Sequence, residues 1–183
     1  MHSKLYVIRF DFEDDYAEEL MDEVKSFIDE YPYGNGDIDY FQSLNEMASM
    51  YNEHNDGNYY KKEIIDGLIK RMNQCADAEA VGANKLKFTK IGMNKYFSNA
   101  IKDVEEFVNS IKTKSGEYDV EKFVSNRYHL IYGILNDEHP KYYSRYAGCE
   151  GEDDFLVTIY NKMMYDNVDE VTVTIEDVYD YHF

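Results

Sequence analysis

The first hydrophobic pattern in the chain is an alternation typical of a β-strand. Residues 5–12 read Leu-Tyr-Val-Ile-Arg-Phe-Asp-Phe and are rich in β-branched and aromatic side chains. Because side chains alternate between the two faces of a strand, one face carries the larger residues, which are Tyr6, Ile8, Phe10 and Phe12. The pattern predicts a strand in a sheet with one well-buried face.

Apolar residues at helical spacing follow in three segments. The spacing predicts helices over residues 17–31, 38–52 and 59–74. Asp14 or Asp15 is expected to cap the first helix, and the turn residues from Pro32 to Gly36 are expected to end it.

The second half of the chain returns from helices to strands. Residues 85–91 alternate, which predicts a short strand, and Asn94 is then expected to cap a long helix that Ser115-Gly116 breaks. A second long helix is expected to reach Leu135. Residues 142–154 show no regular pattern, whereas residues 155–160 and 171–175 are typical of strands.

Strands near both ends and helices between them give an α+β order. We therefore expect a single α+β domain over residues 1–183, with a small, mostly antiparallel sheet from the terminal strands and a central group of helices. A helical subdomain over residues 59–136 is compatible with this order.

Charge is unevenly distributed along the chain, and this distribution is more informative about function than any motif. Residues 1–57 hold 3 Lys/Arg against 15 Asp/Glu, residues 58–114 hold 11 against 7, and residues 115–183 hold 5 against 15. The three segments carry −12, +4 and −10, which sum to the net charge of −18. Fields of this size govern solubility, steering and the choice of partner.

Targeting to a membrane or to an oxidising compartment is not expected. The N-terminal residues enter a strand pattern with no apolar signal segment, and no run approaches the roughly 18–20 apolar residues that span a bilayer. Anionic headgroups would repel the acidic flanks. Cys75 and Cys149 are isolated in the sequence, so we expect a cytoplasmic protein with two reduced thiols.

Catalytic and metal-binding motifs are weak in this sequence. Asp37 and Asp39 are one residue apart and residues 150–154 are dense in carboxylates, which Mg²⁺ prefers. However, 37 of the 183 residues are acidic, so such groups arise by chance. Zinc spacing, an EF-hand loop, a P-loop and a nucleophile elbow are all missing. We therefore expect no catalytic residue, no metal and no cofactor, although the sequence leaves enzyme activity open.

Four lysines in the basic middle are candidates for a local contact with RNA or other nucleic acid. They lie close to Phe88 and Tyr96, whose rings are able to stack on bases. The four are Lys85, Lys87, Lys90 and Lys95. An ordinary solvated surface is the simpler interpretation of the same residues.

Two acidic runs are the candidate partner-binding residues. Surface carboxylates are able to imitate phosphates and occupy a Lys/Arg groove, and tyrosines beside them are able to anchor the contact. The chain has 19 tyrosines and no tryptophan, and tyrosine suits half-buried interfaces. The candidates are Asp11, Glu13, Asp14, Asp15, Tyr142, Tyr143, Tyr146, Glu150, Glu152, Asp153 and Asp154. The alternative is a surface that only solubilises the protein.

In size, acidity, tyrosine content and lack of motifs, the whole chain resembles the small acidic proteins that phages and mobile elements use against bacterial defence. Type II-A anti-CRISPR proteins, which inhibit Cas9, are the nearest fit, and DNA-mimicking antirestriction proteins are the second. The resemblance rests on no shared motif, so it assigns a role to no residue. It implies action in the cytoplasm of a bacterial host by occupation of a nucleic-acid groove.

Three functional hypotheses follow. The first is an inhibitor that binds a nucleic-acid-processing effector such as Cas9. The second is a metal-dependent nuclease that acts on guide RNA or other nucleic acid, with the strand held by the lysines from Lys85 to Lys95. The third is an immunity protein that neutralises a basic nuclease toxin. Strong like charge favours a monomer, while tyrosine-rich faces favour association.

Overall fold

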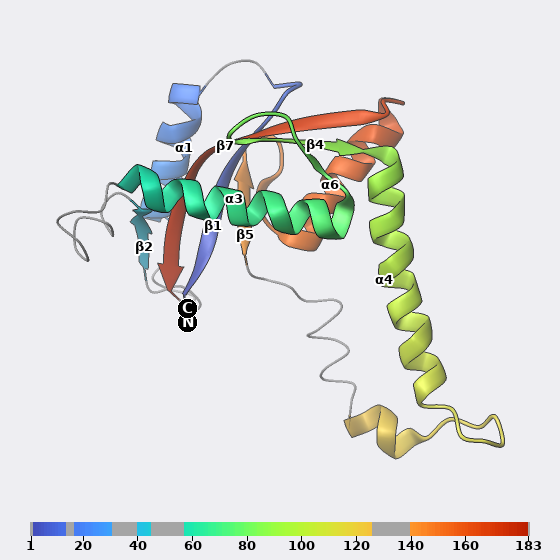
Figure 1. Cartoon of the computed structure of the whole chain (residues 1–183). Coiled ribbons are helices and arrows are strands. Elements are labelled where there is room, and N and C mark those ends of the chain that lie inside the picture. Colours follow the sequence, from blue (N-terminus) through green and yellow to red (C-terminus); the bar gives the residue numbers. More distant parts are fainter. Residues whose placement is uncertain (1, 14–16, 31–39, 45–56, 126–139, 183) are drawn as a thin grey trace.

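The computed structural model describes residues 2–13, 17–30, 40–44, 57–125 and 140–182. The fold is α+β, as the element order predicts, with a mostly antiparallel sheet and helices packed against it (Figure 1). The strands are β1 (His2–Phe10), β2 (Tyr40–Ser43), β3 (Glu79–Ala80), β4 (Lys85–Thr89), β5 (Lys141–Ser144), β6 (Gly148–Gly151) and β7 (Glu170–His182). The labelled helices are α1 (Ala17–Glu30), α3 (Gly57–Ala76), α4 (Lys90–Ser110) and α6 (Glu152–Tyr165).

The long strand β7 organises the sheet, whose order is β3-β4-β7-β1-β5-β6. It pairs antiparallel with β1 from His182 opposite His2 to Val173 opposite Phe10, so the expected sharing of one sheet by the terminal strands is confirmed. β4 pairs with the first part of β7, and β2 pairs with its last part. The pair β1–β5 is parallel, and β6 returns antiparallel to β5.

Both faces of β1 are buried, which corrects the expectation of one buried face. Ile8 and Phe10 lie in the main core with apolar residues of α3 and α6. Leu5 and Val7 on the opposite face are equally buried, and Val7 packs with Leu20 of α1 and its neighbours. The reason is position, because a strand inside the sheet with helices over both faces is apolar on both.

The second predicted helix is partly wrong. Residues 40–43 form β2, which pairs with residues 179–182 of β7. Residues 38–39 and 45–52 of the predicted segment lie outside the described residues. The edge of a long strand offers unpaired backbone groups, and pairing with it outweighs a weak helical preference.

The segment before β7 also differs from its prediction. Residues 155–160, expected as a strand, belong to α6, and the segment expected to be irregular contains the β5–β6 hairpin and the first turn of α6. The buried residues of α6, which are Glu152, Phe155, Leu156, Ile159 and Met163, recur at helical spacing only when the window extends beyond six residues.

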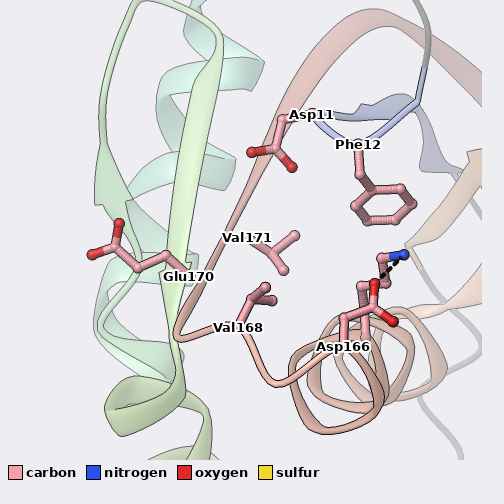
Figure 2. A pocket seen from close by; sticks show the side chains of 7 residues that line it. Asp11, Phe12, Asp166, Val168, Glu170 and Val171 are labelled. Atoms are coloured by element: carbon pink, nitrogen blue, oxygen red, sulfur yellow. Dashed lines mark ion pairs between the residues drawn. The ribbon is translucent and has the colours of Figure 1, made fainter.

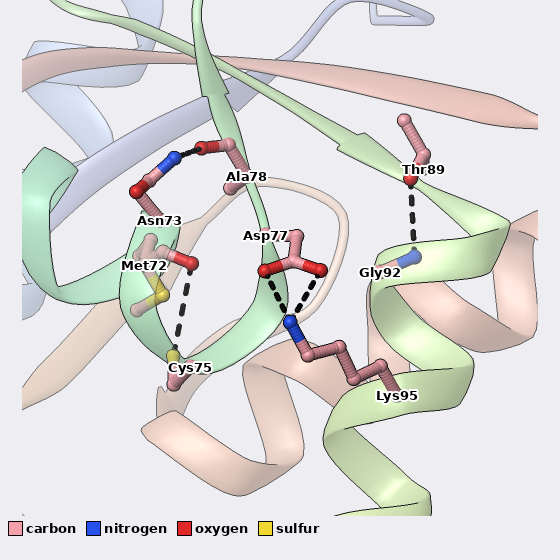
Figure 3. Close-up of polar contacts among 8 residues, drawn as sticks. All are labelled: Met72, Asn73, Cys75, Asp77, Ala78, Thr89, Gly92 and Lys95. Atoms are coloured by element: carbon pink, nitrogen blue, oxygen red, sulfur yellow. Dashed lines mark hydrogen bonds and ion pairs between the residues drawn. The ribbon is translucent and has the colours of Figure 1, made fainter.

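The long helix α4 begins directly after β4 and runs away from the sheet (Figure 1). Its cap is Thr89 and not Asn94, because the Thr89 hydroxyl oxygen accepts a hydrogen bond from the backbone N–H of Gly92 at 3.1 Å (Figure 3). It ends at Ser110, before the predicted break. Residues 120–125 are helical as predicted, and the remainder of that second helix lies outside the described residues.

Candidate partner-binding surface

The first acidic run follows directly from β1. Asp11 is exposed, and its backbone N–H donates to the carbonyl of Thr172 in β7 at 3.0 Å. A carboxylate oxygen of Glu13 accepts the backbone N–H of Phe10 at 2.8 Å and so helps to turn the chain. Asp14 and Asp15 lie outside the described residues. The structure therefore places Asp11 at the surface and gives Glu13 a local structural contact.

A shallow hollow of about 200 Å³ opens beside Asp11, between the end of β1, the beginning of β7 and the last turn of α6 (Figure 2). We call it the Phe12 hollow. Its lining residues are Asp11, Phe12, Lys162, Asp166, Val168, Glu170 and Val171. Figure 2 shows Asp11 and Phe12 on one side of the space, with Val168 and Asp166 across from them. The carboxylates of Asp11 and Asp166 thus lie at the opening together with the apolar side chains of Phe12, Val168 and Val171, while the Glu170 carboxylate points away from it.

A cation already rests on the aromatic wall of this hollow. The Lys162 ammonium lies 4.1 Å from the centre of the Phe12 ring and 5.8 Å from that of Tyr146. It also pairs with the Asp166 carboxylate at 2.5 Å, and this hydrogen bond raises the pKa of Lys162. Phe12 and Tyr146 meet edge to face with their centroids 5.2 Å apart, and Phe10 stacks on Phe12.

The tertiary structure therefore brings one of the three candidate tyrosines to the first acidic run. Tyr146 has 55% of its surface exposed and stands beside Phe12. Tyr143 is half-buried and packs on Phe27 of α1 with ring centroids 5.0 Å apart. Tyr142 is 2% exposed and stacks face to face on Phe155 in the core, so its expected role as a surface anchor is wrong for this fold.

The second acidic run divides between structural and exposed positions. Glu152, Asp153 and Asp154 occupy the first turn of α6, where carboxylates stabilise the positive end of the helix dipole. Glu150 precedes the helix and accepts the Thr158 hydroxyl at 3.0 Å. Half-burial raises the pKa of the Glu150 carboxyl. Of the acidic residues in this run, Asp154 alone is exposed.

Glu152 is the centre of a buried polar cluster. Its carboxylate accepts the Tyr142 hydroxyl at 2.6 Å and forms an ion pair with Arg71 of α3. Arg71 in turn donates to the Tyr142 oxygen at 2.8 Å, so the hydroxyl both accepts and donates. Burial is the main cause that raises the pKa values of Tyr142 and Tyr6. These contacts join α3, β5 and α6, and they make Glu152 unavailable to a partner.

Asp153 and the nearby thiol Cys75 belong to the same region. Asp153 accepts the hydroxyl of Tyr96 from α4, and burial together with this hydrogen bond raises the pKa of Tyr96. Burial likewise raises the pKa of the Cys75 thiol. A thiol with a raised pKa is a poor nucleophile at neutral pH, so the cluster is better suited to holding helices together than to covalent chemistry.

Two of the four candidate lysines form ion pairs with acidic neighbours. Lys87 lies 2.9 Å from Glu79 and 3.3 Å from Glu170, and those hydrogen bonds raise its pKa. Lys95 contacts both oxygens of Asp77 at 2.8 Å (Figure 3). Lys85 is exposed and Lys90 half-buried at the start of α4. A nucleic acid bound here would have to compete with these carboxylates.

Sequence reasoning missed the residues that complete the Phe12 hollow. Lys162 lies in the last turn of α6 and Asp166 caps its C-terminal end four residues later, and a helical assignment of that segment would have paired them. Glu170 begins β7 on the opposite side of the hollow. The sequence shows no link between these residues and Asp11, which the sheet pairing brings close.

Among residues 2–13, 17–30, 40–44, 57–125 and 140–182, no group of three or more His, Cys, Asp or Glu side chains is arranged to hold a metal ion. Asp37 and Asp39 lie outside these ranges. In the same part of the chain, no helix has the length and apolar character needed to cross a bilayer.

Comparisons with known proteins return no match, whether with family models, with curated proteins or with solved structures.

Proposed function

We propose that this protein is a non-enzymatic inhibitor that acts in the cytoplasm of a bacterial host and binds the nucleic-acid groove of a defence nuclease, most concretely Cas9. The observation that supports it is the combination of exposed carboxylates and exposed aromatic rings around the Phe12 hollow, in a chain with a net charge of −18. Asp11 supplies charge at the opening and Glu170 supplies it on the adjoining surface, while Phe12 and Tyr146 supply the anchor.

A basic groove is the partner that this surface fits best. A groove that binds nucleic acid presents Lys and Arg at phosphate spacing, and an acidic protein that enters it releases counterions as nucleic acid does. Exposed aromatic rings add contact area, and buried aromatic side chains contribute a large share of the binding energy of protein interfaces. Further exposed carboxylates lie on α1 at Asp22 and Asp29, so the long-range field extends well beyond the hollow and favours fast association.

The testing experiment is a Cas9 DNA-cleavage assay with the protein added in excess, with the guide RNA run on the same denaturing gel. The proposal predicts lost cleavage with an intact guide. A shortened guide would instead support the metal-dependent nuclease hypothesis, and chelation of Mg²⁺ would then restore the guide. Normal cleavage would contradict the Cas9 proposal for that orthologue, and restriction enzymes and basic nuclease toxins would be assayed next.

Two charge-matched variants make the assay specific to the surface. Asp11→Lys with Glu170→Lys reverses two exposed carboxylates at the hollow, while Glu105→Lys with Glu106→Lys reverses two exposed ones on α4. Both variants shift the net charge equally. We expect the first to lose inhibition and the second to retain most of it. Equal loss in both would contradict a role for this particular surface.

A further inference from the structure

We propose that the Phe12 hollow is a subsite for an arginine side chain of the partner, and that Lys162 is an internal stand-in which the arginine replaces. The inference rests on the proposed function for its class of partner. It adds which residue type is recognised, where it binds and what competes with it.

The first argument is that the hollow already binds a cation. The Lys162 ammonium lies over the face of Phe12 at 4.1 Å from the centroid, with Asp166 as its counter-ion. The buried Phe10 also stacks on Phe12, with the ring centroids 4.9 Å apart. The face that Lys162 covers is therefore the one on which another cation would stack, in exchange for the ammonium.

The second argument is the charge around the opening. Two carboxylates, those of Asp11 and Asp166, and the Lys162 ammonium face the hollow, which leaves a formal charge of −1, whereas the carboxylate of the third acidic lining residue, Glu170, points away from it (Figure 2). Lys162 and Asp166 neutralise each other, and Glu170 reaches toward Lys87 at 3.3 Å. Asp11 makes no ion pair with any residue in the described part of the chain. It is thus the carboxylate with an open place for a guanidinium.

The third argument is the match between the walls and a guanidinium. Phe12, Val168 and Val171 provide apolar surface next to the carboxylates, and Phe12 remains 36% exposed. A guanidinium is planar and weakly hydrated, stacks on aromatic rings and donates two parallel hydrogen bonds to a carboxylate. An ammonium is compact and strongly hydrated, so its transfer from water to this site is less favourable than that of a guanidinium.

The testing probe is the peptide acetyl-Gly-Arg-Gly-amide, compared with acetyl-Gly-Lys-Gly-amide by NMR titration of the ¹⁵N-labelled protein. We expect the largest shifts at the backbone amides of Asp11, Phe12 and residues 166–171, with the arginine peptide bound about two- to fivefold more tightly, as cation–π stacking at an exposed site supports. Equal affinities, or shifts spread evenly over the acidic surface, would overturn the proposal.

Three variants, two of them with matched controls, sharpen the test. Lys162→Gln removes the stand-in and should tighten the arginine peptide about two- to fivefold, more than Lys102→Gln on α4, which changes the net charge equally. Asp11→Asn should weaken binding more than Asp22→Asn on α1. Phe12→Leu should abolish the preference for arginine at unchanged charge. Equal effects of Lys162→Gln and Lys102→Gln would overturn the replacement by arginine.

The peptide test and the Cas9 assay distinguish a failure of the arginine subsite from a failure of the proposed function. Inhibition of Cas9 without an arginine preference at the hollow would overturn the subsite and leave the proposed function standing. A clear arginine subsite without inhibition of any nuclease would support the inference and contradict the proposed function.

Discussion

At the scale of single residues, neighbouring carboxylates in one acidic run have different roles. Glu152 is buried beside Arg71 and Tyr142, Asp153 accepts the Tyr96 hydroxyl, and Asp154 is exposed. The difference follows from direction along the helix, because successive side chains of α6 point about 100° apart. Mutations in this run therefore report on stability or on binding according to position, and the two readouts have to be measured separately.

Glu152→Gln tests the buried cluster. The change keeps the size of the side chain but removes the charge that pairs with Arg71, whose own side chain is 41% exposed and still reaches water. We expect a loss of about 1–2 kcal/mol in the free energy of unfolding, measured by urea denaturation. Asp154→Asn, two residues along the same helix, should change it by less than about 0.5 kcal/mol. An unchanged free energy of unfolding in Glu152→Gln would contradict a stabilising role of the cluster.

The alkylation rate of the Cys149 thiol at pH 9 tests the burial of this side chain in β6. Burial raises the pKa of this thiol from 9.0 to about 11, so less thiolate is present at any pH below that value. At pH 9, we expect alkylation by iodoacetamide to be about tenfold or more slower in the folded protein than in the urea-unfolded chain. Site-resolved mass spectrometry measures both rates. Equal rates would show that the thiol is accessible and ionises normally.

At the scale of elements, the ends of helices were decided by contacts with other elements. The cap of α4 lies at Thr89 because β4 ends there, and the segment of α6 is helical because its apolar face packs on the sheet. Gly92 in the first turn of α4 lies against the end of α3, where a side chain at this position would overlap the carbonyl oxygen of Ala76. The close approach of α3 and α4 therefore requires glycine.

Gly92→Ala tests the close approach of α3 and α4, and Gly67→Ala in α3 is the matched control. A methyl group at position 92 would force the two helix ends apart, and we expect a loss of about 1–3 kcal/mol in the free energy of unfolding. Gly67 lies in the middle of α3 with open space around its Cβ position, so Gly67→Ala should stabilise by about 0.5–1 kcal/mol. Thermal unfolding of both variants gives the comparison, and a stabilised Gly92→Ala would contradict the packing of the two helices.

At the scale of the whole molecule, the sheet joins charges that the sequence keeps apart. β1 and β7 come from opposite ends of the sequence and pair along most of their lengths. The first acidic run therefore meets Asp166 and Glu170 of the third charge segment at the Phe12 hollow. The basic middle is partly neutralised within the fold, as Lys87 and Lys95 show. The acidic field thus dominates the surface around the hollow.

The salt dependence of partner binding tests this electrostatic account. If an acidic surface replaces nucleic acid in a basic groove, affinity should fall at least about tenfold between about 50 and 200 mM salt, with most of the change in the association rate. Surface plasmon resonance against immobilised Cas9 measures both rates. The Asp11→Lys and Glu170→Lys double variant should show a shallower dependence, and an affinity insensitive to salt would contradict the account.

The sequence alone determined the elements whose pattern is long or strictly alternating. β1, α1, α3, β4 and the first part of β7 were predicted with small errors in their ends, because strand and helix geometry impose periods of 2 and 3.6 on the side chains. The α+β class and the sharing of one sheet by the terminal strands followed from the order of those elements. The net charge and its sorting are also properties of the sequence itself.

The short elements and the candidate site depend on contacts between segments that are distant in the sequence. β2 is a strand because the edge of β7 is there to pair with, and Tyr142 is buried because β5 lies inside the sheet beside β1. Short segments carry too little local preference to fix their own conformation. The Phe12 hollow joins Asp11, Lys162 and Glu170, which are far apart in sequence. Their meeting depends on strand pairing and helix packing, which no local pattern encodes.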